Sequence, residues 1–306
     1  MRQIKYSVII PHKNSPDLLL RCLQSIPQRE DIQIIVVDDN SDAKRVDFEH
    51  FPGKGISGID IYLTKEGRGA GYARNVGLKH ARGEWLIFAD ADDYFAEGAF
   101  RIFDAQFENK ADVIYFKSAS VYSDTKAPAD RADSYNALID SYLNDHKNEN
   151  HLRIGFEVPW AKMIRRQFVE QKGIGFDEVP ACNDVIFSML SGYFARTIDV
   201  VPNSVYIVTV SKGSITKRKN HTVFLSRFKV SLRKNKFLKA HGLGRYQKSI
   251  MRNLLGIVKR KPSYIFYSCW LLMKYRQNPF IGIGNWGKTL KNMRDKQKRE
   301  SQYYTS

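Results

Sequence analysis

The chain has 306 residues, of which 43% are hydrophobic and 12% aromatic, with 49 Lys and Arg against 32 Asp and Glu. This composition can bury one large core or two modest ones, which excludes a disordered or fibrous protein. The charge is divided unevenly: residues 1–216 hold 26 basic and 30 acidic side chains, and residues 217–306 hold 23 and 2, a net charge of +21. We therefore expect the two parts to do different work.

Three cysteines, Cys22, Cys182 and Cys269, are far apart and form no Cys-x-x-Cys pair. This spacing indicates neither a disulfide framework nor a zinc site, and it fits a protein of the reducing cytoplasm. The first apolar run ends at Pro11 and is too short for the core of a signal peptide. The longest apolar run, residues 264–273, is too short to cross a membrane but long enough to lie on one.

Short apolar runs alternate with amphipathic stretches from the start of the chain, which predicts strands and helices around a parallel sheet. The predicted strands are residues 7–10, 32–37, 59–63, 85–89, 111–116 and 205–210, and the first predicted helices are residues 17–25 and 72–80. Between them lie a Gly-rich loop at residues 66–71 and a polar loop at residues 123–133. Residues 134–200 mix helical segments with loops, and from residue 222 the pattern is helical and basic.

Acidic side chains directly follow two of the predicted strands. Asp38 and Asp39 end the second strand, and Asp90, Asp92 and Asp93 follow the strand at residues 85–89. In an open α/β sheet, ligands bind beyond the carboxyl ends of the strands. Carboxylates at i and i+2 suit a hard divalent cation shared with substrate phosphates. An isolated Asp-x-Asp is more often a solvated turn, but two acidic groups with a Gly-rich loop between them favour a site.

Five motifs together resemble the family 2 glycosyltransferases, which have the GT-A fold. They are SVIIPHKN, VVDDNSD, GAGYARNVGLKHARGEWLIFADADD, VPWAKMIRR and GFDEVPACND, and they span roughly residues 5–216. The resemblance implies an α/β, Rossmann-like catalytic domain over residues 1–220, with a mostly parallel sheet and flanking helices. A basic, mostly helical extension over residues 221–306 lies outside it.

On the donor side, the resemblance implies that Pro11 and Asp39 hold the nucleotide base, with Asp38 beside them. A carboxylate such as that of Asp39 accepts a hydrogen bond from the N3–H of uracil. Many members of the family stack an aromatic ring on the base where this chain has Lys13. The base is therefore left open, with a UDP-sugar as the leading expectation.

The resemblance also assigns the diphosphate and the metal. Arg74 and Asn75 would lie near the diphosphate, where a cation and helix N-terminal amides favour anionic oxygens. Asp90 would face the ribose or the donor sugar, and Asp92, with Asp90, would hold Mn²⁺ or Mg²⁺. Asp93 would support them from behind.

On the acceptor side, an inverting enzyme needs a carboxylate that deprotonates the attacking hydroxyl. The family's base is the Asp of a Glu-Asp pair, which implies Asp184 here, with Asn183 in place of the Glu. If Asp184 only caps the helix that follows, its loss should lower stability instead. Trp160 and Lys162 match an acceptor-side Trp-x-Lys element, although a Trp is as often part of the core.

The implied function is inverting, metal-dependent transfer of a hexosyl or N-acetylhexosaminyl group from a nucleotide-diphosphate sugar. The acceptor would be a glycan or lipid-linked glycan in surface polysaccharide biosynthesis. One alternative is a nucleotidyltransferase acting on sugar phosphates, but its typical Gly-rich loop after the first strand is here PHKNSPD, without a glycine. A non-catalytic polyanion-binding protein is the other alternative, and it would leave the acidic motifs without a role.

The basic extension calls for a polyanionic partner: an anionic membrane surface, a phosphorylated lipid carrier, an acidic glycan or nucleic acid. Its apolar run among lysines resembles an interfacial helix, which favours a membrane surface, although a helical pair packing on the catalytic domain is the simpler reading. No nucleic-acid-binding motif is present, so we do not expect nucleic acid. We expect a peripheral protein at the inner face of the cytoplasmic membrane.

Overall fold

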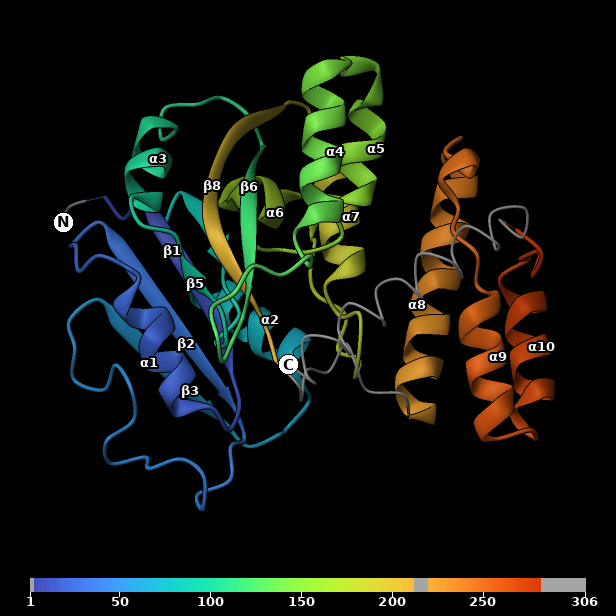
Figure 1. The fold of residues 1–306 in the computed structure, drawn as a ribbon, viewed down its shortest axis with the longest axis horizontal. Helices are drawn as coiled ribbons and strands as arrows, with labels where there is room; N and C mark the ends of the chain where they lie inside the picture. Colours follow the sequence, from blue (N-terminus) through green and yellow to red (C-terminus); the bar gives the residue numbers. More distant parts are fainter. Residues whose placement is uncertain (1–2, 212–219, 282–306) are drawn as a thin grey trace. The chain divides into compact units, whose positions relative to one another are not determined.

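One eight-stranded sheet organises the first part of the computed structural model, which describes residues 3–211 and 220–281 (Figure 1). The strand order is β3-β2-β1-β4-β7-β6-β8-β5. The strands are β1 (Tyr6–His12), β2 (Ile32–Asp39), β3 (Ile59–Thr64), β4 (Trp85–Phe88), β5 (Tyr94–Phe95), β6 (Val113–Tyr122), β7 (Lys162–Arg165) and β8 (Ile198–Val210). β1 to β4 run parallel, and so do β6 and β8, whereas β7 is antiparallel to both β4 and β6 and β5 is antiparallel to β8.

The central strands form because their residues are apolar on both faces. Every residue of β1, β2 and β4 is buried, as expected for parallel strands covered by helices on both sides. β1 lies between β2 and β4, with His12 in register with Asp38 and Ile9 with Phe88. The acidic residues that end β2 and follow β4 therefore lie at the same edge of the sheet.

Seven α-helices flank this sheet. They are α1 (Pro16–Gln24), α2 (Ala70–His80), α3 (Ala99–Ala105), α4 (Asp133–Asn144), α5 (Glu149–Gly155), α6 (Arg166–Lys172) and α7 (Val185–Phe194), with a short 3₁₀ turn, η1 (His146–Asn148), before α5. α2 packs against β1 and β2, and α4, α5 and α7 form a layer beside β6 (Figure 1). The predicted α/β architecture is confirmed.

The predicted sheet lacked the short strand β5 and ended β6 at residue 116 instead of Tyr122, and two further segments were wrong. β7 lies within the stretch expected to hold only helices and loops, and β8 begins at Ile198 instead of residue 205. Both segments become strands by pairing with β6, which is distant in sequence. Four residues, KMIR, carry too little periodicity to predict such a strand.

The chain divides into two compact units, Met1–Arg218 and Lys219–Ser306. We call them the sheet unit and the basic unit. The described part of the basic unit consists of α8 (His221–Ala240), the short 3₁₀ turn η3 (Gly244–Tyr246), α9 (Met251–Arg260) and α10 (Tyr264–Lys274). Its own apolar core includes Phe228, Leu232, Ile257 and Leu271. Within residues 3–211 and 220–281, no helix is long and apolar enough to cross a membrane.

Candidate functional site

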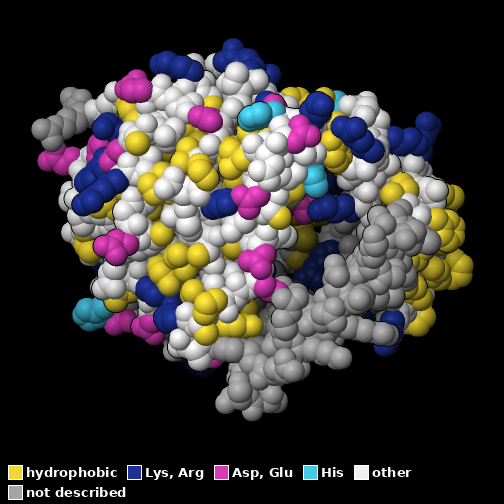
Figure 2. Space-filling view, turned by 45° about the horizontal axis from the view of Figure 1, so that its top comes forward, with side chains coloured by type: hydrophobic (Ala, Val, Ile, Leu, Met, Phe, Trp, Pro, Cys, Tyr) yellow, Lys and Arg dark blue, Asp and Glu magenta, His cyan; other side chains and the backbone are white. Residues whose placement is uncertain are grey.

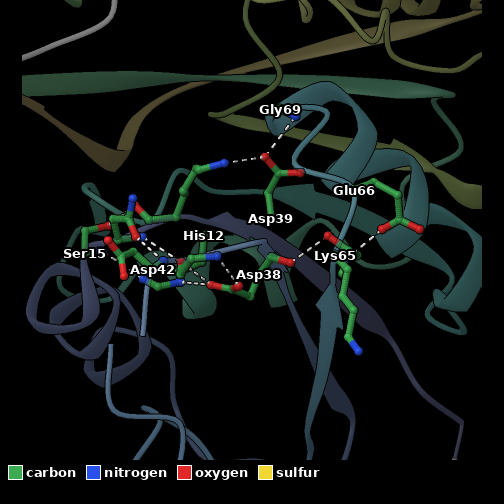
Figure 3. A network of polar contacts seen from close by, with 12 residues as sticks. His12, Ser15, Asp38, Asp39, Asp42, Lys65, Glu66 and Gly69 are labelled. Carbon is green, nitrogen blue, oxygen red and sulfur yellow. Dashed lines mark hydrogen bonds and ion pairs between the residues drawn. The ribbon is translucent and has the colours of Figure 1, made fainter. Parts of the chain in front are cut away.

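Asp39, at the end of β2, presents a buried and partly unpartnered carboxylate. Its side chain is 3% exposed. The Oδ2 atom accepts a hydrogen bond from the Gly69 amide at 2.9 Å and lies 3.4 Å from the Lys13 ammonium, whereas Oδ1 is shielded from solvent and has no partner among the described residues. Figure 3 shows Asp39 facing the Gly-rich loop at Gly69. Because a buried acceptor without a donor is costly, Oδ1 is suited to receive an N–H group from a ligand.

Asp38, the neighbouring residue, turns the other way, toward His12 (Figure 3). The Asp38 Oδ2 atom lies 2.8 Å from His12 Nδ1, and the Ser15 amide donates to His12 Nε2 at 3.1 Å. The proton of the neutral ring is therefore on Nδ1, which donates to Asp38. Ser41 donates to the same carboxylate from its amide and its hydroxyl, at 2.9 and 2.5 Å.

These hydrogen bonds hold the Asp38 side chain in place and give it a structural role. Burial alone would raise the pKa of Asp38, but the hydrogen bonds from His12 and Ser41 hold that pKa below its usual value. Asp38 and Pro11 are both buried, and the Asp38 carboxylate accepts from His12 and Ser41, so it shapes the loops around Asp39; the sequence predicted a donor-binding role for both residues. That role stays a prediction.

Arg74, in the first turns of α2, connects two parts of the site. Its buried guanidinium forms an ion pair with Asp90 and donates to the Asn183 side-chain oxygen at 2.7 Å. It also lies over the Phe176 ring, 5.3 Å from the centroid. Arg74 therefore ties the acidic segment after β4 to the segment before α7, through a hydrogen bond to a residue 109 positions further along the chain.

Asn75, predicted to lie near the diphosphate, contacts the loop before α7. Its side-chain amide donates to the Phe176 carbonyl at 2.9 Å, and its side-chain oxygen accepts from the Phe176 amide at 2.8 Å. Nearby, a Cβ on Gly71 would lie only 2.0 Å from the Asp177 carbonyl oxygen, so only glycine permits this approach. Asn75 and Gly71 hold the loop before α7 against α2. Because Asn75 also donates to Glu178, a direct diphosphate contact would require it to exchange partners.

The three acids after β4 converge. One carboxylate oxygen from each of Asp90, Asp92 and Asp93 lies within 4.8 Å of the others. Burial, and then the charge of Asp90, raise the pKa of Asp92 to about 6. The pKa of Asp93 is also raised, by burial and by Asp92. Hard oxygen donors whose charges repel one another fit a divalent cation, which would relieve that repulsion.

Two residues of β8 hold this acidic segment, and sequence reasoning missed both. Thr209 donates from its amide to Asp93 at 2.7 Å and from its hydroxyl to the Asp92 carbonyl at 2.5 Å. The Asp90 amide donates to the Tyr206 hydroxyl at 2.8 Å. No sequence signal could have found them, because each lies 116 or 117 residues from its partner in an otherwise ordinary strand.

Asp184 occupies the N-cap position of α7, but its side chain makes no capping hydrogen bond within the described part of the chain. Burial raises the pKa of its carboxyl to about 6, against the opposing charge of Arg74. A carboxylate with this pKa is ionised at pH 7 and accepts a proton more readily than an ordinary Asp. The geometry therefore does not support capping as the role of the Asp184 side chain.

Trp160 and Lys162 lie inside the sheet unit. Trp160 is 2% exposed and stacks on Tyr206, with ring centroids 5.7 Å apart. Lys162 is fully buried, donates from Nζ to the Phe156 carbonyl at 2.8 Å, and has its pKa lowered to about 7 by burial. In this structure neither side chain offers a free face to a sugar. Their predicted acceptor-side role is thus limited to supporting the residues that cover them.

The sheet unit resembles known proteins. Residues 7–172, more than half of the chain, match the model of glycosyl transferase family 2. The chain is 25% identical to EpsH of Bacillus subtilis over 230 residues, 72% of this chain and 65% of EpsH. It is 28% identical to the poly(ribitol-phosphate) beta-glucosyltransferase of Bacillus spizizenii over 225 residues, 68% of this chain and 33% of that protein. The match spans less than two thirds of either relative.

The fold has counterparts among solved structures. The crystal structure of S. aureus TarS 1–349 in complex with UDP-GlcNAc superposes with a TM-score of 0.60 at 21% identity, covering 92% of this chain and 77% of that one. This likeness concerns the fold and confirms the predicted GT-A architecture. The family motifs, the sheet topology and the matched residues all agree, and the chain belongs to glycosyl transferase family 2.

Proposed function

We propose that the chain is an inverting, metal-dependent glycosyltransferase that moves a hexosyl or N-acetylhexosaminyl group from a UDP-sugar to a glycan or lipid-linked glycan. The observation that carries the proposal is the arrangement around Arg74, which joins the carboxylate cluster through Asp90 to Asn183, the neighbour of Asp184. Family membership supports the reaction class. The names of the relatives, which include enzymes acting on poly(ribitol phosphate), support a surface polymer as the product.

The donor base would bind at Asp39. The unpartnered Oδ1 would accept the N3–H of uracil, while Oδ2 stays with Gly69. Lys13, next to the same carboxylate, would supply a hydrogen-bond donor to a base carbonyl instead of an aromatic face. The UDP-GlcNAc complex of TarS, a protein with the same fold, supports uracil as the first base to test.

Asp92 and Asp90 would hold Mn²⁺ or Mg²⁺, with Asp93 fixed behind them by Thr209. A bound cation of this kind supplies charge neutralisation to the diphosphate as it leaves. Arg74 would add a fixed positive charge on the same side.

Asp184 would act as the general base. It would take the proton of the acceptor hydroxyl as the oxygen attacks the anomeric carbon, forming the new C–O bond while the bond from that carbon to the diphosphate breaks. The bonding electrons leave with the nucleoside diphosphate, and because the oxygen attacks from the face opposite this leaving group, the product has the inverted configuration. Asn183 would line the acceptor side beside Asp184, with Trp160 and Lys162 supporting the pocket from the core.

The basic unit would bring the enzyme to its acceptor. Residues 217–306 carry 23 Lys and Arg against 2 Asp and Glu, which supports binding to an anionic membrane surface where a lipid-linked acceptor resides. The enzyme would then be a peripheral protein.

The proposal is tested by the melting temperature of the full chain with UDP, GDP, CMP and dTDP, each with and without Mn²⁺. Selective stabilisation by UDP that increases with Mn²⁺ is expected, because a ligand that binds only the native state raises its stability. Asp92→Asn should remove the Mn²⁺-dependent part, whereas Glu97→Gln, at an exposed acid away from the cluster, should not. Stabilisation by no nucleotide, together with no sugar transfer to any glycan acceptor, would overturn the proposal.

A further inference from the structure

The described part of the basic unit contains no acidic side chain. Residues 220–281 hold 14 Lys and Arg and no Asp or Glu. This segment holds no carboxylate side chain of its own to offset these cations, so it carries a strong net positive charge that attracts an external anion. This composition indicates that the partner is negatively charged. The exposed side chains of the basic unit must indicate what kind of molecule it is.

α10 has two apolar faces instead of one. Its inner face packs in the core of the basic unit through Leu271, which is 3% exposed, and the polar Ser268 on the same face is also buried. On the opposite face, Phe266, Trp270 and Met273 are 81%, 46% and 70% exposed. These three residues follow the spacing i, i+4 and i+7, so they lie in one row along the helix. We call this row the outer face of α10.

Figure 2 shows hydrophobic side chains gathered at the right edge, the side on which Figure 1 draws α9 and α10, with Lys and Arg side chains nearby. Single exposed apolar residues are common on protein surfaces, but a contiguous aromatic patch marks a contact site.

Lysines lie against the aromatic rings of α10. The Lys274 ammonium is 4.9 Å from the Trp270 ring centroid, and Lys229, from α8, is 5.3 Å from the Tyr267 ring. Tyr267 in turn stacks on Trp270, with centroids 5.6 Å apart. The apolar row is therefore bordered by cations whose long stems follow the rings, the arrangement of a side chain that keeps its charge at a polar boundary.

We infer that the outer face of α10 inserts into the interface of an anionic lipid bilayer, with the helix lying parallel to the surface. This inference deepens the membrane partner of the proposed function and rests on it. With 11 residues α10 is about 16 Å long, so it suits an interfacial position and not a crossing. Phosphate headgroups would meet the lysines while the acyl boundary takes up the three apolar side chains.

A second copy of the chain fits this face less well. Pairing two basic units through α10 would bring two segments of net charge +14 together, which repel each other. Nucleic acid would meet the charge but would leave Met273 and Phe266 without an apolar environment. An anionic lipid surface satisfies both requirements.

The test is cosedimentation of the full chain with vesicles of phosphatidylglycerol and phosphatidylcholine at about 0.15 M salt, where screening weakens purely electrostatic attraction. We expect F266S/W270S/M273S to bind these vesicles about tenfold more weakly or worse. The matched control is I56S/L63S, which replaces apolar residues of the sheet unit that are 47% and 56% exposed, and it should bind as the unaltered chain does. K261E/K274E should also weaken vesicle binding, and the loss should be larger at low salt than at high salt.

Equal binding by the triple variant and the unaltered chain would overturn the inference. A change from dimer to monomer in the triple variant, measured by light scattering and without loss of vesicle binding, would also overturn it and assign the face to a second copy. The melting-temperature shift with UDP and Mn²⁺ is recorded on the same proteins. If that shift and sugar transfer are both absent while vesicle binding depends on α10, the proposed reaction fails and the inference of membrane binding still holds.

Discussion

The two units of the chain treat charge in opposite ways. The sheet unit pairs many of its basic side chains with its own carboxylates, and some of these pairs are partly buried, as in Arg74 with Asp90. The basic unit carries its lysines and arginines without any acidic residue between positions 220 and 281, and sets several of them against aromatic rings. A buried, paired charge holds neighbouring residues in place, whereas an exposed charge attracts a partner molecule. Removing a charge should therefore affect stability or turnover in the sheet unit and binding of a partner in the basic unit.

The largest effect is expected at Asp184. Asp184→Asn should lower kcat by about 10²- to 10⁴-fold, the usual contribution of a general base. Its melting temperature should hardly change, because the side chain makes no capping bond among the described residues. In the unaltered enzyme, kcat/KM should fall as the pH drops below about 6, because protonation of Asp184 removes the base.

The control for Asp184 is Asp145→Ala, which removes a side chain that does cap, accepting from the Lys147 amide. This control should lose up to about 1 kcal/mol of stability and keep its activity. The reverse pattern, an active but destabilised Asp184→Asn, would assign Asp184 to the helix cap instead of the reaction.

The buried pair between His12 and Asp38 should matter for stability. His12→Phe removes both ring hydrogen bonds and leaves the buried Asp38 with donors from Ser41 alone, which should cost about 2–3 kcal/mol in the free energy of unfolding, measured by denaturant titration. His80→Phe is the control, because His80 is exposed and stacks on Tyr62. A loss below 0.5 kcal/mol, the usual range for a surface change, would show that the pair does not organise the donor loops.

Arg74 should be irreplaceable by lysine. A single ammonium cannot reproduce the fork that reaches both Asp90 and Asn183, so Arg74→Lys should lower kcat/KM by about 10- to 100-fold. Arg68→Lys changes an exposed arginine that pairs with Glu178, and it should stay within about twofold. Equal effects at the two positions would mean that the link between donor and acceptor segments has no role in turnover.

Lys162 should make stability depend on pH. Its pKa is about 7 in the folded chain and 10.5 in the unfolded chain, so the unfolded state binds the extra proton between these values. The free energy of unfolding should therefore rise with pH over this range, by at most about 1.4 kcal/mol per pH unit. Lys162→Met should remove that slope, and Lys110→Met, at an exposed lysine, should keep it. An unchanged slope in Lys162→Met would show that the buried amine is not responsible.

The smallest effect on stability is expected in the basic unit. Lys239→Gln with Lys259→Gln removes two exposed cations and should change the free energy of unfolding by less than about 0.5 kcal/mol. Binding to anionic vesicles should weaken and become less dependent on salt. A large loss of stability would contradict the contrast between the two units.

The sequence predicted those parts of the molecule that depend on local pattern. β1, β2 and β4 are continuous apolar runs, and the acids after β2 and β4 meet because parallel strands end at one edge. β7 and the start of β8 could not be predicted, since their conformation comes from pairing with the distant β6.

The candidate site shows the same limit. The resemblance named Asp39, Asp90, Asp92 and Asp184, but it could not indicate that Asn75 is engaged by the Phe176 backbone. Nor could it decide whether Trp160 faces an acceptor or the core, because an aromatic residue suits both. Partners distant in sequence, Phe176 for Asn75 and Tyr206 for Trp160, determine these outcomes.

The contact at Gly71 limits how the acceptor side can diverge among related sequences. Any side chain at position 71 would have to displace the backbone at Asp177, on the loop that leads to Asn183 and Asp184. The path of that loop past α2 is therefore fixed at Asp177. New acceptor preferences would have to arise from substitutions at loop positions whose side chains make no contact with α2, or from changes away from Asp177.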